Sequence, residues 1–272
     1  MGAVHGVYLK YVVLSAGSYA SLYCLAPEDA AAAASAGAPP VWLLSTLAYM
    51  TVINMLIAVL FRMESCMEIL GKDERTGKVP AWSYVLFAGF HLPTWLYTRL
   101  HRFQDAAKGV AAADEVAPGW WLGGRYGAEL GRTWAGVVDL TCEFPEGCEG
   151  SSEDSYLLLR CWDGVPPTPE QLEQAAAFAA KKRKEGHIMV HCAHGRGRST
   201  TVMCACLVKA GLFERWDEAF EAVKKKRTCV RLNQRMREAL TAWQEIHDAP
   251  AGQGKTVCNR AVQESEFHDA TE

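Results

Sequence analysis

Val190-His191-Cys192-Ala193-His194-Gly195-Arg196-Gly197-Arg198-Ser199-Thr200 is the stretch that decides the fold. An apolar run, Ile188 to Val190, precedes it, and the run Thr201 to Gly211 follows it. Read as strand, loop and helix, this order brings the amide N–H groups of the loop together at a helix N-terminus, where they can bind one tetrahedral anion. Gly195 and Gly197 let the chain curl without a side chain between it and the anion. The stretch therefore predicts a phosphate-binding loop.

Two side chains in this loop suit phosphate chemistry. Arg198 can hold two phosphate oxygens through a bidentate pair of hydrogen bonds, which a lysine cannot reproduce. The same positive surroundings lower the pKa of the Cys192 thiol, so we expect a nucleophilic thiolate at neutral pH. The alternative is that Cys192 is one of several buried cysteines and Arg198 a surface charge. The two glycines, Ser199 and the flanking strand and helix favour the phosphate-binding loop.

His191-Cys192, five intervening residues and Arg198-Ser199 resemble the phosphate-binding loop of the cysteine-dependent phosphatases, in a setting similar to their dual-specificity branch. The resemblance covers roughly residues 114–247, and nothing in residues 1–103 belongs to it. It implies an α/β domain with a central sheet flanked by helices, and chemistry that needs no metal or other cofactor. It assigns catalytic parts to His191, Cys192, Arg198 and Ser199, and phosphate binding to Ala193, His194, Gly195, Arg196, Gly197 and Arg198.

Asp163 is the candidate general acid. Tyr156 to Cys161 predicts a strand, and the prolines in Trp162-Asp163-Gly164-Val165-Pro166-Pro167 fix a loop after it. The alkoxide or phenolate that leaves phosphorus must receive a proton, which a mobile carboxylic acid can supply. The resemblance places that acid on a loop about this far before the cysteine. A solvated turn aspartate is the alternative. Other carboxylates, on or beyond an earlier strand, fit less well: Asp139, Glu143 and Asp154.

Further segments predict elements of the same domain. Gly136 to Leu140 holds a β-branched pair suited to a buried strand. Thr168-Pro169-Glu170-Gln171 is typical of a capping box and starts a helix that runs to about Glu185. Asn233 precedes a last helix, roughly Gln234 to His247. By the resemblance Asn233 buttresses the phosphate-binding loop, whereas on physical grounds alone it is a helix cap.

Residues 1–103 predict a helical region that anchors the chain in a membrane. Val41 to Phe61 carries no charge and one polar amide, Asn54, and is long enough to cross a bilayer, with a buried core helix as the alternative. Val7 to Ala26 is interrupted only by Lys10, which can snorkel from a helix end. Trp82 to Thr98 is shorter and could span the bilayer, dip into it or lie in its interface.

The distribution of positive charge favours one topology. Residues 27–40 contain no Lys or Arg, whereas residues 62–80 contain Arg62, Lys72, Arg75 and Lys78, and more follow residue 98. We therefore expect two spans, with both flanks of residues 82–98 in the cytosol. Because a thiolate nucleophile needs a reducing environment, we place residues 104 onward on the cytosolic side of an integral membrane protein.

The rest of the chain predicts a linker at residues 104–113 and a disordered tail at 248–272, which is rich in glycine and polar residues. The net charge of −3 over 272 residues argues against a nucleic-acid partner. The ten cysteines are irregularly spaced, which does not suggest a disulfide framework. Two basic runs end helices, and they either complement the helix dipoles or bind anionic lipid headgroups: Lys181 to Lys184 and Lys224 to Arg227.

The sequence leaves the substrate open between two classes. Phosphorylated tyrosine, serine or threonine in proteins is the first choice, because dual-specificity enzymes of this kind are the commoner case. A phospholipid, either a phosphoinositide or phosphatidylglycerophosphate, is the alternative, because Arg196 and His194 add positive charge to the loop beside a membrane. A non-catalytic phosphate-binding membrane adaptor is a remote third, since the cysteine, the arginine and the acid are all present.

Overall fold

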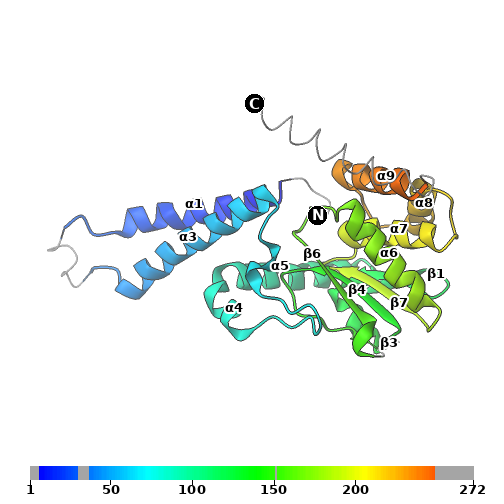
Figure 1. The fold of residues 1–272 in the computed structure, drawn as a ribbon. Coiled ribbons are helices and arrows are strands. Elements are labelled where there is room, and N and C mark those ends of the chain that lie inside the picture. Colours follow the sequence, from blue (N-terminus) through cyan, green and yellow to red (C-terminus); the bar gives the residue numbers. More distant parts are fainter. Residues whose placement is uncertain (1–5, 30–36, 151, 249–272) are drawn as a thin grey trace, which may run out of the picture.

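The computed structural model describes residues 6–29, 37–150 and 152–248. All but the first residue of the tail predicted for 248–272 lies outside the described residues. The described elements fall into two groups, an N-terminal set of helices and a C-terminal set of strands and helices (Figure 1).

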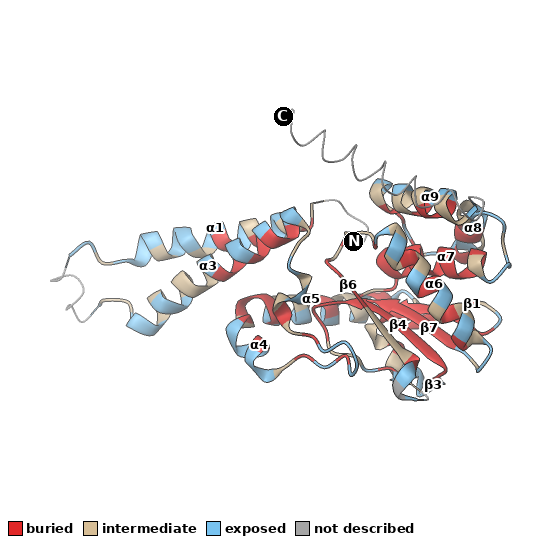
Figure 2. Cartoon of the chain, in the orientation of Figure 1, coloured by how far each residue is buried: buried red, intermediate tan, exposed pale blue. Residues whose placement is uncertain are grey.

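A five-stranded mixed sheet forms the centre of the C-terminal part (Figure 1). Its strands lie in the order β1 (Ala113–Ala117), β2 (Trp120–Gly124), β7 (Ile188–Cys192), β4 (Gly136–Thr141) and β6 (Tyr156–Cys161). β1 pairs antiparallel with β2, and the other neighbours are parallel. Every residue of β4 and β7 is buried, as expected of parallel strands in the middle of a sheet (Figure 2). The predicted strands at 136–140 and 156–161 are confirmed.

Three helices pack on this sheet, α6 (Pro169–Arg183), α7 (Arg198–Lys209) and α8 (Trp216–Lys226), and α9 (Gln234–Asp248) packs on these helices. The predicted capping box begins α6: Thr168 Oγ1 accepts a hydrogen bond from the Gln171 N–H at 3.3 Å, and Gln171 Oε1 accepts one from the Thr168 N–H at 3.0 Å. Small elements complete this part: η2 (Arg125–Leu130), β3 (Thr133–Trp134), β5 (Glu149–Gly150) and η3 (Glu153–Ser155). The predicted α/β fold with a central sheet flanked by helices is confirmed.

Two long helices, α1 (Tyr8–Leu25) and α3 (Val41–Met63), pack along each other and project from the rest of the molecule (Figure 1). The chain then forms η1 (Met67–Leu70), α4 (Ala81–Leu86) and α5 (Ala88–Ala107). Within the described residues, only α3 is both long and apolar enough to cross a membrane, and 28% of its most apolar window is buried. Figure 2 shows that the outer half of α1 is largely exposed and that the outer half of α3 is exposed or half-buried.

The N-terminal helices contact the C-terminal part closely. The ring of Phe61, near the end of α3, stacks on Trp162 with 4.3 Å between the ring centroids. The Trp162 indole N–H donates a hydrogen bond to the Ser65 carbonyl at 3.0 Å. α5 continues through Ala107, so the first part of the stretch predicted as a linker is helical. The two parts are therefore in contact across the boundary that the sequence predicts.

Lys72 is buried, so it is not one of the surface cations that the sequence suggested for residues 62–80. Its side chain is fully buried and forms an ion pair with Asp139 on β4. It also donates hydrogen bonds to the carbonyl and the hydroxyl of Thr141, at 2.9 and 3.0 Å. Lys72 is thus part of the interior rather than a cation that faces a membrane surface.

Candidate active site

The predicted phosphate-binding loop connects β7, which ends at Cys192, to α7, which begins at Arg198. The loop curls around the Cys192 sulfur, which lies 3.3 Å from the Ser199 hydroxyl oxygen and accepts a hydrogen bond from the Gly195 N–H at 3.3 Å. Gly195 has a φ of 67°, and a Cβ atom there would lie 2.2 Å from the backbone of Gly123. Only glycine therefore fits at this position.

The surroundings of Cys192 favour a thiolate. Burial opposes ionisation, but the positive charge of Arg198 and the hydrogen bond from Ser199 outweigh it, so the pKa of Cys192 lies below its ordinary value. A larger fraction of the thiol is then ionised at neutral pH. The geometry agrees with the predicted nucleophile.

Arg198 is buried beside Cys192 and is held by the ends of two strands. Its Nη1 donates to the Leu140 carbonyl at 3.1 Å and to the Cys161 carbonyl at 2.6 Å. Its Nη2 lies 2.9 Å from a carboxylate oxygen of Glu143 and 3.4 Å from one of Asp163. The Nε atom is buried without a partner among the described residues. A buried donor without a partner is costly, so this N–H is suited to binding an anion in the loop.

Two carboxylates flank Arg198, and their surroundings differ. Glu143 is 6% exposed, and it also accepts a hydrogen bond from the Cys142 N–H at 3.0 Å, so both Arg198 and the backbone fix it. Asp163 is 20% exposed and lies further from Arg198. Glu143 therefore orients the guanidinium, while Asp163 is the carboxylate more accessible to a substrate. The sequence interpretation weighed Glu143 only as a rival acid. Glu143 lies just beyond the carboxyl end of a buried strand, and this position could have indicated a role in the site.

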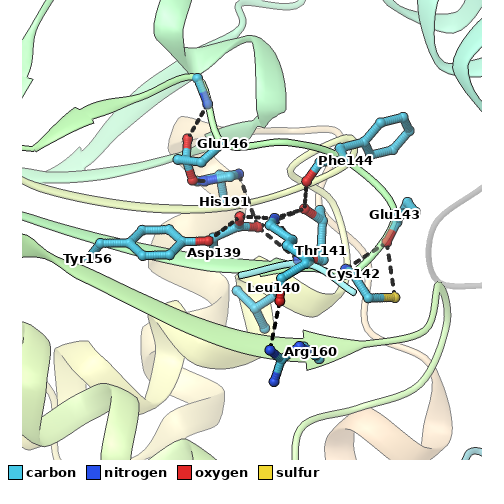
Figure 3. A network of polar contacts seen from close by, with 12 residues as sticks. Asp139, Leu140, Thr141, Cys142, Glu143, Phe144, Glu146, Tyr156, Arg160 and His191 are labelled. Carbon is cyan, nitrogen blue, oxygen red and sulfur yellow. Dashed lines mark hydrogen bonds and ion pairs between the residues drawn. The ribbon is translucent and has the colours of Figure 1, made fainter. Parts of the chain in front are cut away.

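His191 belongs to a buried polar network behind the loop, not to the phosphate-binding surface (Figure 3). Side chains alternate along a strand, so His191 and Cys192 point to opposite faces of β7. His191 Nε2 lies 2.7 Å from a Glu146 oxygen, and Nδ1 lies 3.9 Å from Asp139. Burial lowers the His191 pKa, but these two carboxylates raise it more, to about 9. The imidazole is thus charged at neutral pH and positions the strand that carries the nucleophile.

Glu146, Cys148 and His191 are close enough to hold a metal ion, the one such group found in the described residues. However, a metal binds a neutral imidazole and a thiolate. His191 is protonated at neutral pH, and burial raises the pKa of the Cys148 thiol. The ion pair between His191 and Glu146 accounts for the cluster, and the absence of a metal cofactor stays a prediction.

Arg196 and His194 do not supply the additional positive charge that the sequence suggested. Arg196 Nη2 lies 2.6 Å from a carboxylate oxygen of Asp105, on α5. The His194 ring packs against His101, at 4.5 Å between centroids, and against Tyr97, at 5.8 Å. Burial lowers the pKa of His194 to about 3, so the ring is neutral. Both residues instead connect the phosphate-binding loop to α5.

Asn233 is a helix cap, which was one of its two sequence-based interpretations, whereas Arg227 differs from its interpretation. The Asn233 oxygen accepts a hydrogen bond from the Met236 N–H at 2.8 Å, as a helix cap does, and its amide donates to the Gly164 carbonyl at 2.9 Å. It thus supports the loop that carries the candidate acid. Arg227, interpreted as part of a surface basic run, is buried and donates to the Gly195 and His194 carbonyls at 2.9 and 3.3 Å. Arg227 is the residue that braces the phosphate-binding loop.

The chain was compared with protein families and with solved structures. Residues 164–246 match the family model of the dual specificity phosphatase catalytic domain. Human DUSP28 has a similar solved structure, with 24% identity, a TM-score of 0.42, and coverage of 51% of this chain and 97% of that one. A mouse putative dual specificity phosphatase complexed with zinc tungstate matches with 24% identity, a TM-score of 0.43, and coverage of 54% and 91%. PTPMT1 in complex with PI(5)P matches with 21% identity, a TM-score of 0.39, and coverage of 56% and 99%.

Among curated proteins, none matches the chain. The fold, the loop around Cys192 and the family match lead to one conclusion. The C-terminal part of the chain is an α/β domain similar to the dual-specificity phosphatase catalytic domain, whose family model matches residues 164–246.

Proposed function

We propose that the chain is a membrane-anchored phosphatase that hydrolyses phosphomonoesters through a phosphocysteine at Cys192. One observation carries the proposal. The thiol, whose pKa is lowered, shares its loop with a buried arginine whose Nε atom has no partner among the described residues. A nucleophile and an anion clamp are the two parts that a cysteine-dependent phosphatase needs in one place.

In the first step the Cys192 thiolate attacks phosphorus and the bond to the leaving oxygen breaks. Asp163 donates its proton to that oxygen, so the product leaves as an alcohol or a phenol. Arg198 and the amides of the loop bind the equatorial phosphoryl oxygens, where negative charge is spread in the transition state. Glu143 accepts a hydrogen bond from the Arg198 guanidinium and keeps it in place.

In the second step a water molecule attacks the phosphocysteine. Asp163, now ionised, removes a proton from that water, and inorganic phosphate is released. The sulfur leaves as a thiolate, and the Ser199 hydroxyl, 3.3 Å from the sulfur, stabilises it by a hydrogen bond. This returns the protein to its starting state, with the Cys192 thiolate free and Asp163 protonated by the proton that it took from the water.

Turnover of a small aryl phosphate by the purified protein tests this proposal. We expect Cys192→Ser to abolish turnover while phosphate still binds, because Arg198 and the loop amides are unchanged. Arg198→Lys should abolish both turnover and phosphate binding, because lysine cannot form the bidentate pair of hydrogen bonds to phosphate. Undiminished turnover by Cys192→Ser protein would exclude Cys192 as the nucleophile. Absence of turnover in the wild type, with phosphate binding intact, would favour the non-catalytic adaptor instead.

The membrane anchor is the second part of the proposal. It is supported by the length and composition of α3 and by exposed apolar side chains on α1, such as Val13 and Tyr23, and on α5, such as Trp95. We expect the protein to resist extraction from membranes by alkaline carbonate, and residues 104 onward to be open to protease from the cytosol. Release by high salt alone would contradict an integral anchor. Glycosylation of acceptor sites engineered into residues 62–80 would contradict two spans with that segment in the cytosol.

A phosphoprotein remains the substrate that the sequence favours, and a phospholipid the alternative. The alternative no longer rests on Arg196 and His194, since the first is paired and the second is neutral. A different feature favours a lipid, namely an apolar cavity that reaches Asp163. Turnover of phosphotyrosine peptides, phosphoinositides and phosphatidylglycerophosphate in vesicles distinguishes the two classes directly.

A further inference from the structure

A cavity of about 550 Å³ lies between the N-terminal helices and the phosphate-binding loop. One wall comes from α1, with Val7 and Leu14, and another from α5, with Phe90 and Pro93. Ala193 and Asp163 also line it, so the cavity reaches the residue that follows the nucleophile. Its volume is within the usual range for small-molecule sites, about 300–1,000 Å³.

The position of Asp163 determines which part of a substrate enters this cavity. A general acid must lie within hydrogen-bond reach of the oxygen that it protonates, which is the oxygen of the leaving group. Asp163 lines this cavity and also a second, more polar one beside Arg62 and Arg235, and only the first is suited to an apolar skeleton attached to that oxygen. Polar groups without partners are costly in apolar surroundings, so a peptide backbone fits this space poorly and a hydrocarbon chain fits it well.

The polar atoms along the cavity narrow the class of ligand. The hydroxyl of Tyr11 and the Thr94 oxygen lie 3.3 Å apart and satisfy each other. The hydroxyl of Tyr97, another lining residue, is buried and has no partner among the residues that the structure describes. A ligand with a hydrogen-bond acceptor between its phosphate and its apolar end would satisfy that hydroxyl.

The outer side of the cavity faces the surface that a bilayer would cover. Leu9, Val13 and Leu14 line it from α1, and all three are also exposed to the exterior. Exposed leucine and valine, with the exposed Lys10 beside them, on the helix that packs along the candidate membrane span suit the boundary between headgroups and acyl chains. A lipid could therefore enter the cavity without passing through water.

We propose that this cavity binds the acyl chain of a phosphorylated glycerolipid, with its ester oxygen on the Tyr97 hydroxyl and its phosphate in the loop at Cys192. The inference rests on the proposed phosphatase function and names the substrate class for the same site. The N-terminal helices are then part of the substrate-binding site as well as an anchor. They supply the α1 and α5 walls, which the predicted catalytic region at 114–247 lacks.

The experiment compares glycerol phosphates that carry an acetyl, a hexanoyl or a decanoyl chain, each below its micelle-forming concentration, with an aryl phosphate as the reference. In the full-length protein we expect kcat/KM to rise at least about tenfold from the hexanoyl to the decanoyl ester, because each buried methylene contributes up to about fourfold. The ratio of decanoyl ester to aryl phosphate turnover is the quantity that isolates the cavity.

Leu14→Trp, which fills the cavity, should lower that ratio at least about tenfold, since it removes the space for the added methylenes. Leu56→Trp is the matched control. Leu56 lies on α3 with 39% exposure, against 38% for Leu14, and does not line the cavity. The control should leave the ratio unchanged. Tyr97→Phe is a second variant in case Leu14→Trp fails to fold. It should raise KM for the esters more than KM for the aryl phosphate.

The results distinguish a failure of the acyl-chain site from a failure of the phosphatase function. No dependence on chain length in a wild-type protein that hydrolyses the aryl phosphate would overturn the acyl-chain site and leave the phosphatase intact. A phosphotyrosine peptide that outperforms the decanoyl ester and loses as much on Leu14→Trp would assign the cavity to a peptide. Absence of aryl phosphate turnover in the wild type would contradict the phosphatase function itself.

Discussion

Replacing Lys72 by methionine should strongly destabilise the protein. The Lys72 ammonium and the Asp139 carboxylate are both 0% exposed, so solvent screening does not weaken their interaction. Methionine preserves most of the apolar stem but removes the cation paired with the carboxylate, which keeps only the His191 imidazolium, 3.9 Å away, as a charged neighbour. Removing one member of a buried pair costs about 3–5 kcal/mol of unfolding free energy. Because Asp139 keeps a hydrogen bond from the Tyr156 hydroxyl at 3.0 Å, we expect the lower end, about 3 kcal/mol.

Urea unfolding of the detergent-solubilised protein, followed by tryptophan fluorescence, measures this change as a lower midpoint at an unchanged slope. Lys78→Met is the matched control, because Lys78 belongs to the same segment and is exposed, and it should leave the midpoint unchanged. Adding Asp139→Asn to Lys72→Met removes the uncompensated charge and should recover part of the loss. A loss below about 1 kcal/mol for Lys72→Met alone would refute the idea that the Lys72 side chain is part of the interior.

Three further predictions concern the site. Asp163→Asn should slow hydrolysis of phenyl phosphate by about 100-fold or more, but that of a dinitrophenyl phosphate far less, because only the poorer leaving group needs a proton. Equal losses for the two substrates would point to another acid. Because the His191 pKa is raised in the folded protein, its contribution to stability is complete below pH ~6.5 and is lost as the pH rises through about 9. Urea midpoints should fall over that interval in the wild type and not in His191→Gln. Arg227→Lys should lower kcat by up to about 100-fold with little change in thermal midpoint, because the phosphate-binding loop loses the hydrogen bond to its Gly195 carbonyl. An unchanged kcat would show that Arg227 does not position the loop.

Local patterns in the sequence predicted the fold and the backbone of the loop around Cys192 well. The apolar run before Cys192, the two glycines and the apolar run after Ser199 specify a strand, a tight loop and a helix, and each is observed. The capping box at Thr168 likewise begins α6. These features depend on neighbours within a few residues, so one sequence contains the information for them.

Contacts between residues far apart in the chain could not be predicted in this way. Lys72 and Asp139 are 67 residues apart, and Arg196 and Asp105 are 91 apart, so nothing in either local stretch names its partner. The charge assigned to His194 failed for the same reason, since α5 buries its ring and lowers its pKa. Arg227 was taken for a surface cation because it follows three lysines, although the structure buries it under the loop.

The central claim is that Cys192 forms a covalent bond to phosphorus during turnover. The most direct measurement is rapid acid quenching of the protein with a radiolabelled aryl phosphate, followed by mapping of any label retained on the chain. We expect acid-stable label on the peptide that contains Cys192, more of it in Asp163→Asn protein, where the second step is slowed, and none in Cys192→Ser. Turnover without label on Cys192, or label on another residue, would contradict the account.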